Sequence, residues 1–529
     1  MHRSILRPSS SVADRGGGRA SRLAWRTTLK PSPLLLLALC AALQDTAAFA
    51  QGATRTAGPL PQEPPLRLSE RTDSVAADLE SFIPRYLRAN RVPGAAIALI
   101  RGDRVVWTKG FGVANALTRR PVTPETLFEV ASNGKALTAY VALRLVDQGR
   151  LSLEEPLDSY LPEPWFPSPG SGNAVTLRRV LSHTSGLSAS ATLSRNLLFA
   201  PGSHYYYSGI GFMYLQRVLE QVSGKPLEDL AQEVLFVPLG MTSSSFVNRA
   251  DLTPRTANGH LHALVPSVVF AVLYAVSLVI VGLPGLVVLR VRTGRWRPTR
   301  RGVVGVLCVA FVLSLAPVLV LAGRIALFEF AWLFVFCALA LAAAFALSLA
   351  AGGVAILRLT TRRSGRIALS VAWSVLVVIG IGALASRVAN LPVPRWPAVS
   401  ANAAGSVRAT VADMGAFLIE LAHPRLLSAA TAAQLRTPQV RLSSDISWGL
   451  GPGIQHSRQG DALWQWGQHV DFQSVMIIYP EHGLGVVVCT NNDLLGADVA
   501  LEIAHRALGG KIEPIRQAIH LAFNYRGGS

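Results

Sequence analysis

The sequence predicts an α+β fold in which one antiparallel sheet flanked by helices is interrupted by a bundle of four transmembrane helices. A strand hairpin is expected at residues 95–111, and a meander of three strands at 463–490. Helical patterns lie between these two groups of strands, as do four long apolar runs. A chain of 529 residues is also long enough for more than one domain.

The first soluble part of the chain begins with a helix over 72–90, whose apolar residues fall on one face. Strands at 95–101 and 105–111 follow, joined by a turn at Gly102 and Asp103. The next helix begins at Ser132, shows apolar residues at helical spacing and is closed by Gly149. A short capped turn and further helices are expected at 151–161, 175–181, 210–222 and 227–235.

The second soluble part resumes the same kind of pattern. A helix is expected over 407–422, and a strand over 447–454. Three strands joined by short turns follow at 463–467, 472–479 and 485–490, and a final amphipathic helix at 497–508. The chain is thus expected to divide into a signal peptide (1–50), a linker (51–70), a soluble domain in two parts (71–262 and 389–510), four transmembrane helices (263–388) and a C-terminal tail (511–529).

The first 50 residues have the layout of a secretory signal peptide. A basic region reaches to Lys30, an apolar run at 33–43 is too short to cross a bilayer, and Ala48-Phe49-Ala50 forms an A-x-A cleavage signal. The alternative is an uncleaved anchor. Residues 51–70 are rich in Pro, Gly and Thr, which is typical of a linker.

Four apolar runs interrupt the soluble pattern at 264–289, 303–321, 330–357 and 367–385. Each run is long enough to cross a bilayer, which takes about 20 residues. The loops at 290–301 and 358–366 are strongly basic, so they are expected on the cytoplasmic side, with both flanks of the insertion outside. Because the spans lack acidic residues except Glu329 at an edge, they are interpreted as an anchor and not as a transporter or channel.

The formal net charge of +19 could suggest a nucleic-acid partner. Much of the excess, however, lies in the N-terminal region and in the two basic loops, so it follows membrane topology. The sequence contains 4 cysteines, with no metal-ligand spacing and no pattern of a disulfide framework. We therefore expect no nucleic acid, metal or organic cofactor, and we expect the lipid bilayer as a partner.

Ser132 precedes Lys135 by three residues at the start of a predicted helix. Positions i and i+3 share one helix face, so both side chains should point into the same space. A desolvated lysine can be neutral enough to take the serine proton, and free N–H groups at a helix start can stabilise an oxyanion. Taken alone, the spacing is more typical of an N-cap serine beside a solvated lysine.

Several stretches together resemble the β-lactamase and penicillin-binding-protein-like serine hydrolases, in the branch that contains class C β-lactamases, D-Ala-D-Ala peptidases and esterases. The matching segments occur in the family's order at 128–135, 181–187, 201–208 with the helix to 224, 238–241, 404–418 and 463–492. The resemblance implies the β-lactamase/transpeptidase-like fold, an antiparallel sheet flanked by helices with a helical subdomain. The membrane segment would then be an insertion within one catalytic fold.

The resemblance also implies roles for individual residues. Ser132 would be the nucleophile, Lys135 the proton acceptor, and Tyr207 the group that passes the proton to the leaving group. The positive lysine could drive the phenol of Tyr207 toward phenolate. The oxyanion hole would consist of the backbone N–H groups of Ser132 and Gln468.

Two motif positions depart from the family and fall among the expected substrate-binding residues Gln465, Gly467 and Gly209. The family's Tyr-x-Asn is here Tyr207-Ser208-Gly209, and its Lys/His-x-Gly is here Gln465-Trp466-Gly467. Both departures should weaken recognition of a carboxylate-bearing substrate such as a β-lactam. His469 is a candidate for supplying the missing imidazole, although a histidine at a strand end is more often simply exposed.

His183 beside Ser185 is a second candidate base, although the resemblance implies that this loop is structural.

The main hypothesis is a membrane-anchored serine hydrolase that acts on an ester, amide or peptide, such as a cell-wall-derived one. Its catalytic domain would face the periplasm from a bacterial inner membrane. The alternative is a degenerate member that binds a cell-wall or peptide ligand, or a partner, without turnover.

Overall fold

The computed structural model of the chain describes residues 63–167, 170–188, 195–261, 391–392, 400–492 and 498–523. The predicted signal peptide and all four predicted membrane spans lie outside these residues. Within the described ranges, no helix combines the length and the apolar character needed to cross a bilayer.

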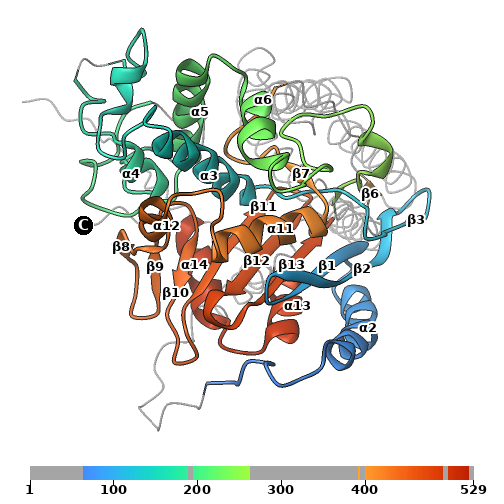
Figure 1. Cartoon of the computed structure of the whole chain (residues 1–529). Helices are drawn as coiled ribbons and strands as arrows, with labels where there is room; N and C mark the ends of the chain where they lie inside the picture. The colour runs from blue at the N-terminus through green and yellow to red at the C-terminus, as the bar shows by residue number, and fades with distance from the viewer. Residues whose placement is uncertain are drawn as a thin grey trace, which may run out of the picture. The chain divides into compact units, whose positions relative to one another are not determined.

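One antiparallel sheet organises the described part of the chain (Figure 1). Its strand β1 (Gly94–Arg101) pairs with β2 (Arg104–Asn115) on one side and with β13 (Leu484–Thr490) on the other. The order across the nine strands described is β3-β2-β1-β13-β12-β11-β10-β9-β8. The remaining strands are β3 (Arg120–Pro121), β8 (Val440–Arg441), β9 (Ile446–Trp448), β10 (Gly453–Gln455), β11 (Ala462–Gln468) and β12 (Gln473–Tyr479). The prediction that the initial hairpin and the final meander share one sheet is confirmed.

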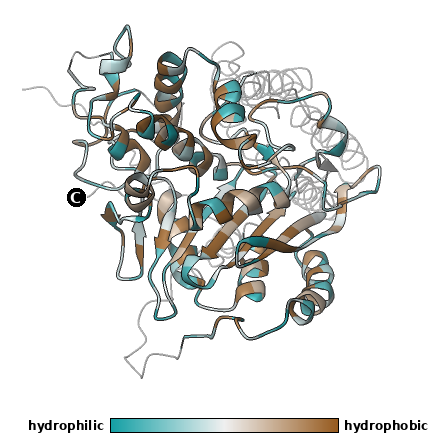
Figure 2. Cartoon of the chain, viewed as in Figure 1, coloured by the Kyte–Doolittle hydropathy of each residue, from teal (hydrophilic) through white to brown (hydrophobic). Residues whose placement is uncertain are grey.

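Alternate residues of β1 enter two different hydrophobic cores. Ala96, Ala98 and Ile100 belong to the core shared with helix α11 (Val411–Ala422), whereas Ala95, Ile97 and Leu99 face the opposite side. That second core is shared with α2 (Thr72–Ala89), α13 (Val499–Leu508) and α14 (Glu513–Phe523). A strand buried on both faces is continuously apolar, as β1 is, while α2 shows separate hydrophobic and hydrophilic faces (Figure 2).

A group of helices packs around α3 (Asn133–Asp147), which contacts strands β11 and β12. Besides α3, it comprises α4 (Leu177–Leu181), α5 (Gly209–Ser223) and α6 (Leu227–Ala231), which continues as a π-helical turn, η2 (Gln232–Phe236). Helix α3 was expected to be amphipathic, but its residues from Asn133 to Leu143 are buried without interruption. It is enclosed because α5, α6, α12 (Ala429–Arg436) and the sheet all pack around it. Three short 3₁₀ turns complete the described elements at Leu157–Tyr160, Thr253–Arg255 and Pro480–His482.

Three expectations from the sequence were wrong in detail. The helix expected from 407 begins at Val411, because Arg408–Ala409 is extended as strand β7 and pairs with β4 (Phe128–Glu129). The single strand expected at 447–454 is a hairpin of β9 and β10, since the chain reverses at Gly451 with φ of 120°. Most of the expected C-terminal tail is helix α14, with Ile515 in the core.

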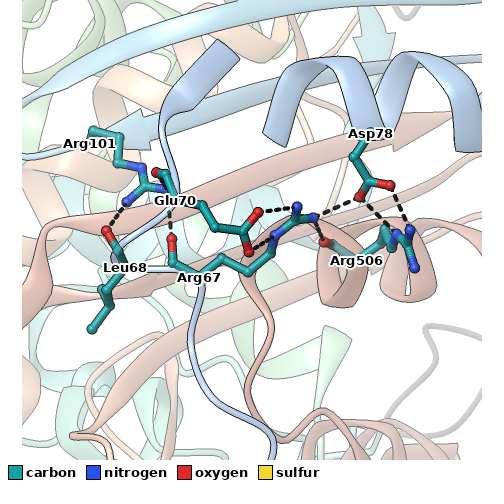
Figure 3. A network of polar contacts seen from close by, with 6 residues as sticks. All are labelled: Arg67, Leu68, Glu70, Asp78, Arg101 and Arg506. Atoms are coloured by element: carbon teal, nitrogen blue, oxygen red, sulfur yellow. Dashed lines mark hydrogen bonds and ion pairs between the residues drawn. The ribbon is translucent and has the colours of Figure 1, made fainter. Parts of the chain in front are cut away.

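The segment before α2 is fastened to the C-terminal part of the fold by arginines (Figure 3). Arg67 binds Glu70 through two hydrogen bonds of 2.7 and 2.6 Å, and it reaches Asp78 at 2.7 Å. Arg506 on α13 binds the same Asp78 carboxylate, and Arg101 on β1 donates to the carbonyl oxygens of Arg67 and Leu68. These contacts hold α2 against the face of the sheet that α13 covers.

Two short strands bracket the segment at 262–390. Strand β5 (His260–Leu261) pairs antiparallel with β6 (Leu391–Pro392), with His260 opposite Pro392 and Leu261 opposite Leu391. The chain therefore leaves and re-enters the described fold at neighbouring positions, as an insertion within one fold requires.

Candidate active site

Ser132 occupies a sharp turn between strand β4 and helix α3. The preceding residue, Ala131, has φ of 47°, a left-handed conformation that costs a non-glycine residue about 1–2 kcal/mol. A backbone hydrogen bond stabilises the turn, in which the Val130 N–H donates to the Val407 carbonyl at 2.9 Å. Ser132 is only partly buried and stands at the N-cap of α3, where helical N–H groups lack intrahelical partners.

Lys135 lies one turn along α3 and reaches back to Ser132. Its Nζ donates to Ser132 Oγ at 2.9 Å and to the Ala404 carbonyl at 2.7 Å. The residue is 3% exposed, and its burial lowers the pKa of the ammonium from 10.5 to about 7. A large fraction of Lys135 is therefore neutral at pH 7, which is the state that can accept the serine proton.

Tyr207 brings a third polar group to the same point. Its hydroxyl is hydrogen-bonded to the Ser132 side chain and accepts from Gln465 Nε2 at 3.3 Å. Burial raises the pKa of Tyr207 above its ordinary value, even though both hydrogen bonds act in the opposite direction. The expected phenolate is therefore wrong for the resting site. A neutral phenol sits beside a lysine that is itself only partly charged.

His183 supports the tyrosine and does not act on Ser132. Its Nδ1 accepts a hydrogen bond from the Ser208 N–H at 3.0 Å, which makes this nitrogen the unprotonated one. The imidazole lies 4.3 Å from the Tyr207 ring between centroids, and burial, with a smaller effect of the Lys135 charge, lowers the pKa of His183 well below 6.5. The only nitrogen able to take a proton is thus already an acceptor within the loop, as the structural interpretation expected.

Strand β11 forms the other wall of the site. Strand β10 pairs with Ala462, Leu463 and Trp464 of β11 and with no later residue of that strand. The edge of β11 beyond Trp464 therefore faces the residues around Ser132. Gln465 is fully buried there, and its Nε2 also donates to the Ser132 carbonyl at 3.1 Å. Among the predicted residues, Ser132, Lys135, Tyr207 and Gln465 are thus brought into direct contact.

Gly467 has a steric role at this edge. A Cβ atom at this position would lie 2.0 Å from the Val130 carbonyl oxygen and 2.5 Å from Ser474 Oγ. Only glycine lets β11 approach the turn that carries Ser132 so closely. The strand ends one residue later at Gln468, so the second predicted oxyanion donor lies next to this contact.

The position of the family's asparagine, Gly209, is the first residue of helix α5. Ser208 caps this helix by accepting from the Gly211 N–H at 2.9 Å.

The Ala404 carbonyl, in the second half of the fold, accepts a hydrogen bond from Lys135. Sequence reasoning missed Ala404, because a backbone carbonyl acceptor leaves no signal in residue identity.

A second group of charges lies beside the strand end. His469 Nδ1 is hydrogen-bonded to Glu129, and Arg408 lies 3.5 Å from the same carboxylate. Burial alone would raise the pKa of Glu129, but the neighbouring His469 and Arg408 outweigh it and hold that pKa below its ordinary value. His469 is therefore engaged with a buried carboxylate three residues before Ser132.

A further network, also unpredicted, ties α3 to β12. Asn133 Nδ2 donates to Ser474 Oγ at 2.7 Å, and Ser474 donates to the Val130 carbonyl at 2.8 Å. No residue spacing in the sequence links positions so far apart.

Across the described ranges, no group of three or more His, Cys, Asp or Glu side chains is arranged to hold a metal ion.

Comparisons with known proteins agree with this geometry. A family model described as Beta-lactamase matches residues 79–276 and 378–511. Because the match covers more than half of the sequence, the chain belongs to the beta-lactamase family. Its fold is that of the serine hydrolases of this family, which include penicillin-binding-protein-like proteins and esterases.

Two curated proteins illustrate the range of relatives. Esterase EstB of Burkholderia gladioli is 31% identical over 220 residues, which cover 35% of this chain and 55% of EstB. Putative penicillin-binding protein PbpX of Bacillus subtilis (strain 168) is 30% identical over 197 residues, which cover 35% of this chain and 49% of PbpX. The chain thus spans about half the length of these relatives.

A solved structure agrees at the level of the fold. The octameric penicillin-binding protein homologue from Pyrococcus abyssi aligns with a TM-score of 0.51 and 17% identity, covering 84% of this chain and 77% of that one.

Proposed function

We propose that this protein is a serine hydrolase that forms an acyl-enzyme at Ser132 from an ester, amide or peptide and then hydrolyses it. The observation that carries the proposal is the buried Lys135 amine, 2.9 Å from Ser132 Oγ, with a pKa of about 7. An amine in this state is a competent base at neutral pH.

The contacts support the following sequence of proton movements. Neutral Lys135 takes the proton of Ser132 as Oγ attacks the substrate carbonyl carbon, and the oxyanion that forms is stabilised by the backbone N–H groups of Ser132 and Gln468. As the bond to the leaving group breaks, the Tyr207 hydroxyl gives the leaving atom a proton and is re-protonated from Lys135. Water repeats the attack on the ester carbonyl and releases Ser132.

We propose an ester or a peptide, such as a cell-wall-derived peptide, as the substrate in preference to a β-lactam. Gln465 offers no charge to a substrate carboxylate, and Gly209 offers no side-chain amide. One relative is named an esterase, which supports an ester. Another is named a putative penicillin-binding protein, which supports a peptide.

Membrane anchoring is also part of the proposal. The apolar runs between 264 and 385 would hold the enzyme in a bacterial inner membrane as a multi-pass protein, with the catalytic fold on the periplasmic side. The pairing of β5 with β6 supports this arrangement, since an even number of spans returns the chain to the side from which it left.

The test is covalent labelling of the detergent-solubilised full chain with a fluorescent alkylphosphonate that reacts with activated serines. Wild type should be labelled, Ser132→Ala should not, and Ser185→Ala should be labelled like wild type. Ser185 is the matched control, because it is a buried serine close in sequence to His183. Folded wild type that takes no label would instead favour a protein that binds a cell-wall ligand or a partner without turnover.

A further inference from the structure

The turn between strands β2 and β3 presents an apolar side chain to solvent. Leu117 is 74% exposed, the highest value among the large hydrophobic side chains of the described residues. Thr118 and Arg119 beside it are exposed as well. Single exposed leucines are common on protein surfaces, so the exposure of Leu117 alone does not identify a partner. Its position relative to strand β5 supplies that information.

The turn is held in one conformation by an asparagine. Asn115 Oδ1 accepts hydrogen bonds from the N–H groups of Leu117 and Thr118 at 2.9 and 3.0 Å. Such a side chain stabilises a turn by bonding the backbone a few residues on. Arg119, with φ of 57°, completes the reversal into β3. The backbone of Leu117 is therefore fixed at the tip of the turn.

Two hydrogen bonds join this turn to the segment that leads into the insertion. Asn115 Nδ2 donates to Asn258 Oδ1 at 3.0 Å, and the Ala116 N–H donates to His260 Nε2 at 3.0 Å. His260 is fully buried and is the first residue of β5. Leu117 is thus the neighbour of a residue that contacts β5 directly.

The contact with His260 is stable at neutral pH. Its Nδ1 faces the Asn491 carbonyl at 3.1 Å, so this nitrogen carries the proton and Nε2 is the acceptor. Burial lowers the pKa of His260 to about 4, so the imidazole is neutral at pH 7 and keeps the acceptor that Ala116 uses. The turn and β5 therefore form one connected corner of the fold.

The proposed membrane anchor begins close to this corner. Leu264 opens the first apolar run three residues after Leu261, the end of β5. Because extended backbone reaches at most about 3.6 Å per residue, the proposed anchoring puts the edge of the hydrocarbon core within about 11 Å of β5. The headgroup region adds roughly 5–7 Å on each side of that core. The corner that carries Leu117 then lies at the membrane surface.

We propose that the turn at residues 116–119 is a membrane-contact element, in which Leu117 enters the bilayer interface and Arg119 binds lipid phosphate. Insertion removes the exposed apolar surface of the leucine from water, and a guanidinium matches the geometry of a phosphate. This inference rests on the membrane anchoring in the proposed function and not on the chemistry at Ser132. It gives the catalytic fold an attachment to lipid besides its two chain connections.

Fluorescence quenching in vesicles tests the contact. The full-length protein is prepared with its three cysteines outside the described residues replaced by alanine, since the fourth, Cys489, is buried. Thr118→Cys is labelled with the fluorophore NBD, and the protein is reconstituted into vesicles of phosphatidylcholine and phosphatidylglycerol. Lipids that carry a nitroxide near the top of the acyl chain should quench this probe severalfold more strongly than the same probe at Asp103→Cys.

Asp103 is the matched labelling site. Its side chain is 85% exposed, and it lies in the turn at the opposite end of β2. At about 3.3 Å per residue, the strand separates the two turns by roughly 35 Å. Equal quenching at the two sites would overturn the assignment of lipid contact to the turn at 116–119.

Three further variants, each in the Thr118→Cys protein, assign the contact to side chains. Leu117→Asp should reduce quenching to the level at residue 103, because a carboxylate resists entry into lipid. Leu521→Asp, which places the same charge at an exposed leucine of α14, should leave quenching unchanged. Arg119→Glu should lower quenching in the mixed vesicles more than in phosphatidylcholine alone. Equal loss with Leu117→Asp and Leu521→Asp would overturn the role of Leu117.

Flotation separates this inference from the anchoring on which it rests. Wild type should stay with the vesicles after extraction with alkaline carbonate. Protein that is removed by this treatment would overturn the anchoring and the inference together. Protein that stays with the vesicles while its probe at residue 118 is not quenched would overturn the inference alone. Phosphonate labelling of Ser132 reports separately on the proposed chemistry.

Discussion

Burial and hydrogen bonding have opposite effects on the ammonium form of Lys135: burial destabilises it, and the hydrogen bonds stabilise it. The enclosing residues remove water from the ammonium, while the Ser132 hydroxyl and the Ala404 carbonyl accept its protons. The net effect is a lowered pKa, because desolvation is the larger influence. The low pKa of Lys135 thus arises from burial in the fold and not from a charged neighbour.

The rate of Ser132 labelling should therefore follow the neutral fraction of Lys135. Because the pKa of Lys135 is lowered to about 7, labelling should rise about tenfold per pH unit below that value and level off above it. The measurement is the phosphonate labelling rate of wild type between pH 5 and 9.

Lys135→Arg provides the control for this profile. Arginine remains protonated throughout the pH range, so labelling should fall by roughly 10²–10⁴-fold at every pH. A wild-type rate that stays flat from pH 5 to 8, or that rises only above pH 9, would rule out Lys135 as the base.

The residues that could be predicted from sequence are those whose side chains carry the chemistry at a recognisable spacing. Ser132, Lys135 and Tyr207 are of this kind, and the structure brings them together. The Ala404 carbonyl could not be predicted, because its role depends on position alone. The protonation of Tyr207 was misjudged, since the sequence shows the nearby lysine but not the depth of burial, which keeps the phenol protonated and lowers the pKa of Lys135.

At the scale of elements, the site depends on how closely β11 approaches the turn between β4 and α3. The strand itself was predictable from its apolar and aromatic residues. The short strands β4 and β7 were not, because two-residue strands leave no periodic pattern. Their pairing, Phe128 with Ala409 and Glu129 with Arg408, fixes the turn against which β11 packs.

Gly467→Ala should separate this close approach from general stability. The added Cβ would clash with the Val130 carbonyl, so β11 or the Ser132 turn must move, at a cost of about 1–3 kcal/mol in the free energy of unfolding. Thermal unfolding should show the loss of stability, and phosphonate labelling should fall sharply.

Gly149→Ala is the matched variant. Gly149 follows α3 with φ of 67° and has open space around a Cβ, so alanine should cost about 1–2 kcal/mol through backbone strain alone. Labelling should persist in this variant. Equal loss of labelling in both proteins would mean that stability, and not the approach of β11, controls the site.

At the scale of the whole molecule, the two halves of the catalytic fold are mutually dependent. Strand β1 comes from the first half and pairs along its length with β13 from the second. The sequence predicted this closure from the hairpin and the meander. It could not predict how the ends of the intervening segment are joined, because strands β5 and β6 are two residues each.

The register of β5 and β6 makes the segment at 262–390 replaceable by a turn. Leu261 pairs with Leu391, so a two-residue Asn-Gly turn, which favours type I′ hairpins, should connect them without moving either strand. The shortened protein should fold without detergent and label at the wild-type rate, and Ser132→Ala in the same background should not label. Aggregation, or a folded product that takes no label, would show that residues 262–390 contribute to the catalytic fold.

The pairing of β1 with β13 also determines when the residues of the proposed active site can come together during synthesis of the chain. The ribosome releases Ser132, Lys135 and Tyr207 long before it releases Ala404, Gln465 and Gln468, and β1 lacks one of its two partner strands until residue 490 has emerged. Such long-range pairing is slow to form and leaves strand edges exposed in the meantime. We therefore expect Ser132 to be an ordinary serine in the nascent chain, and the proposed hydrolytic activity to begin only after strand β13 has joined the sheet.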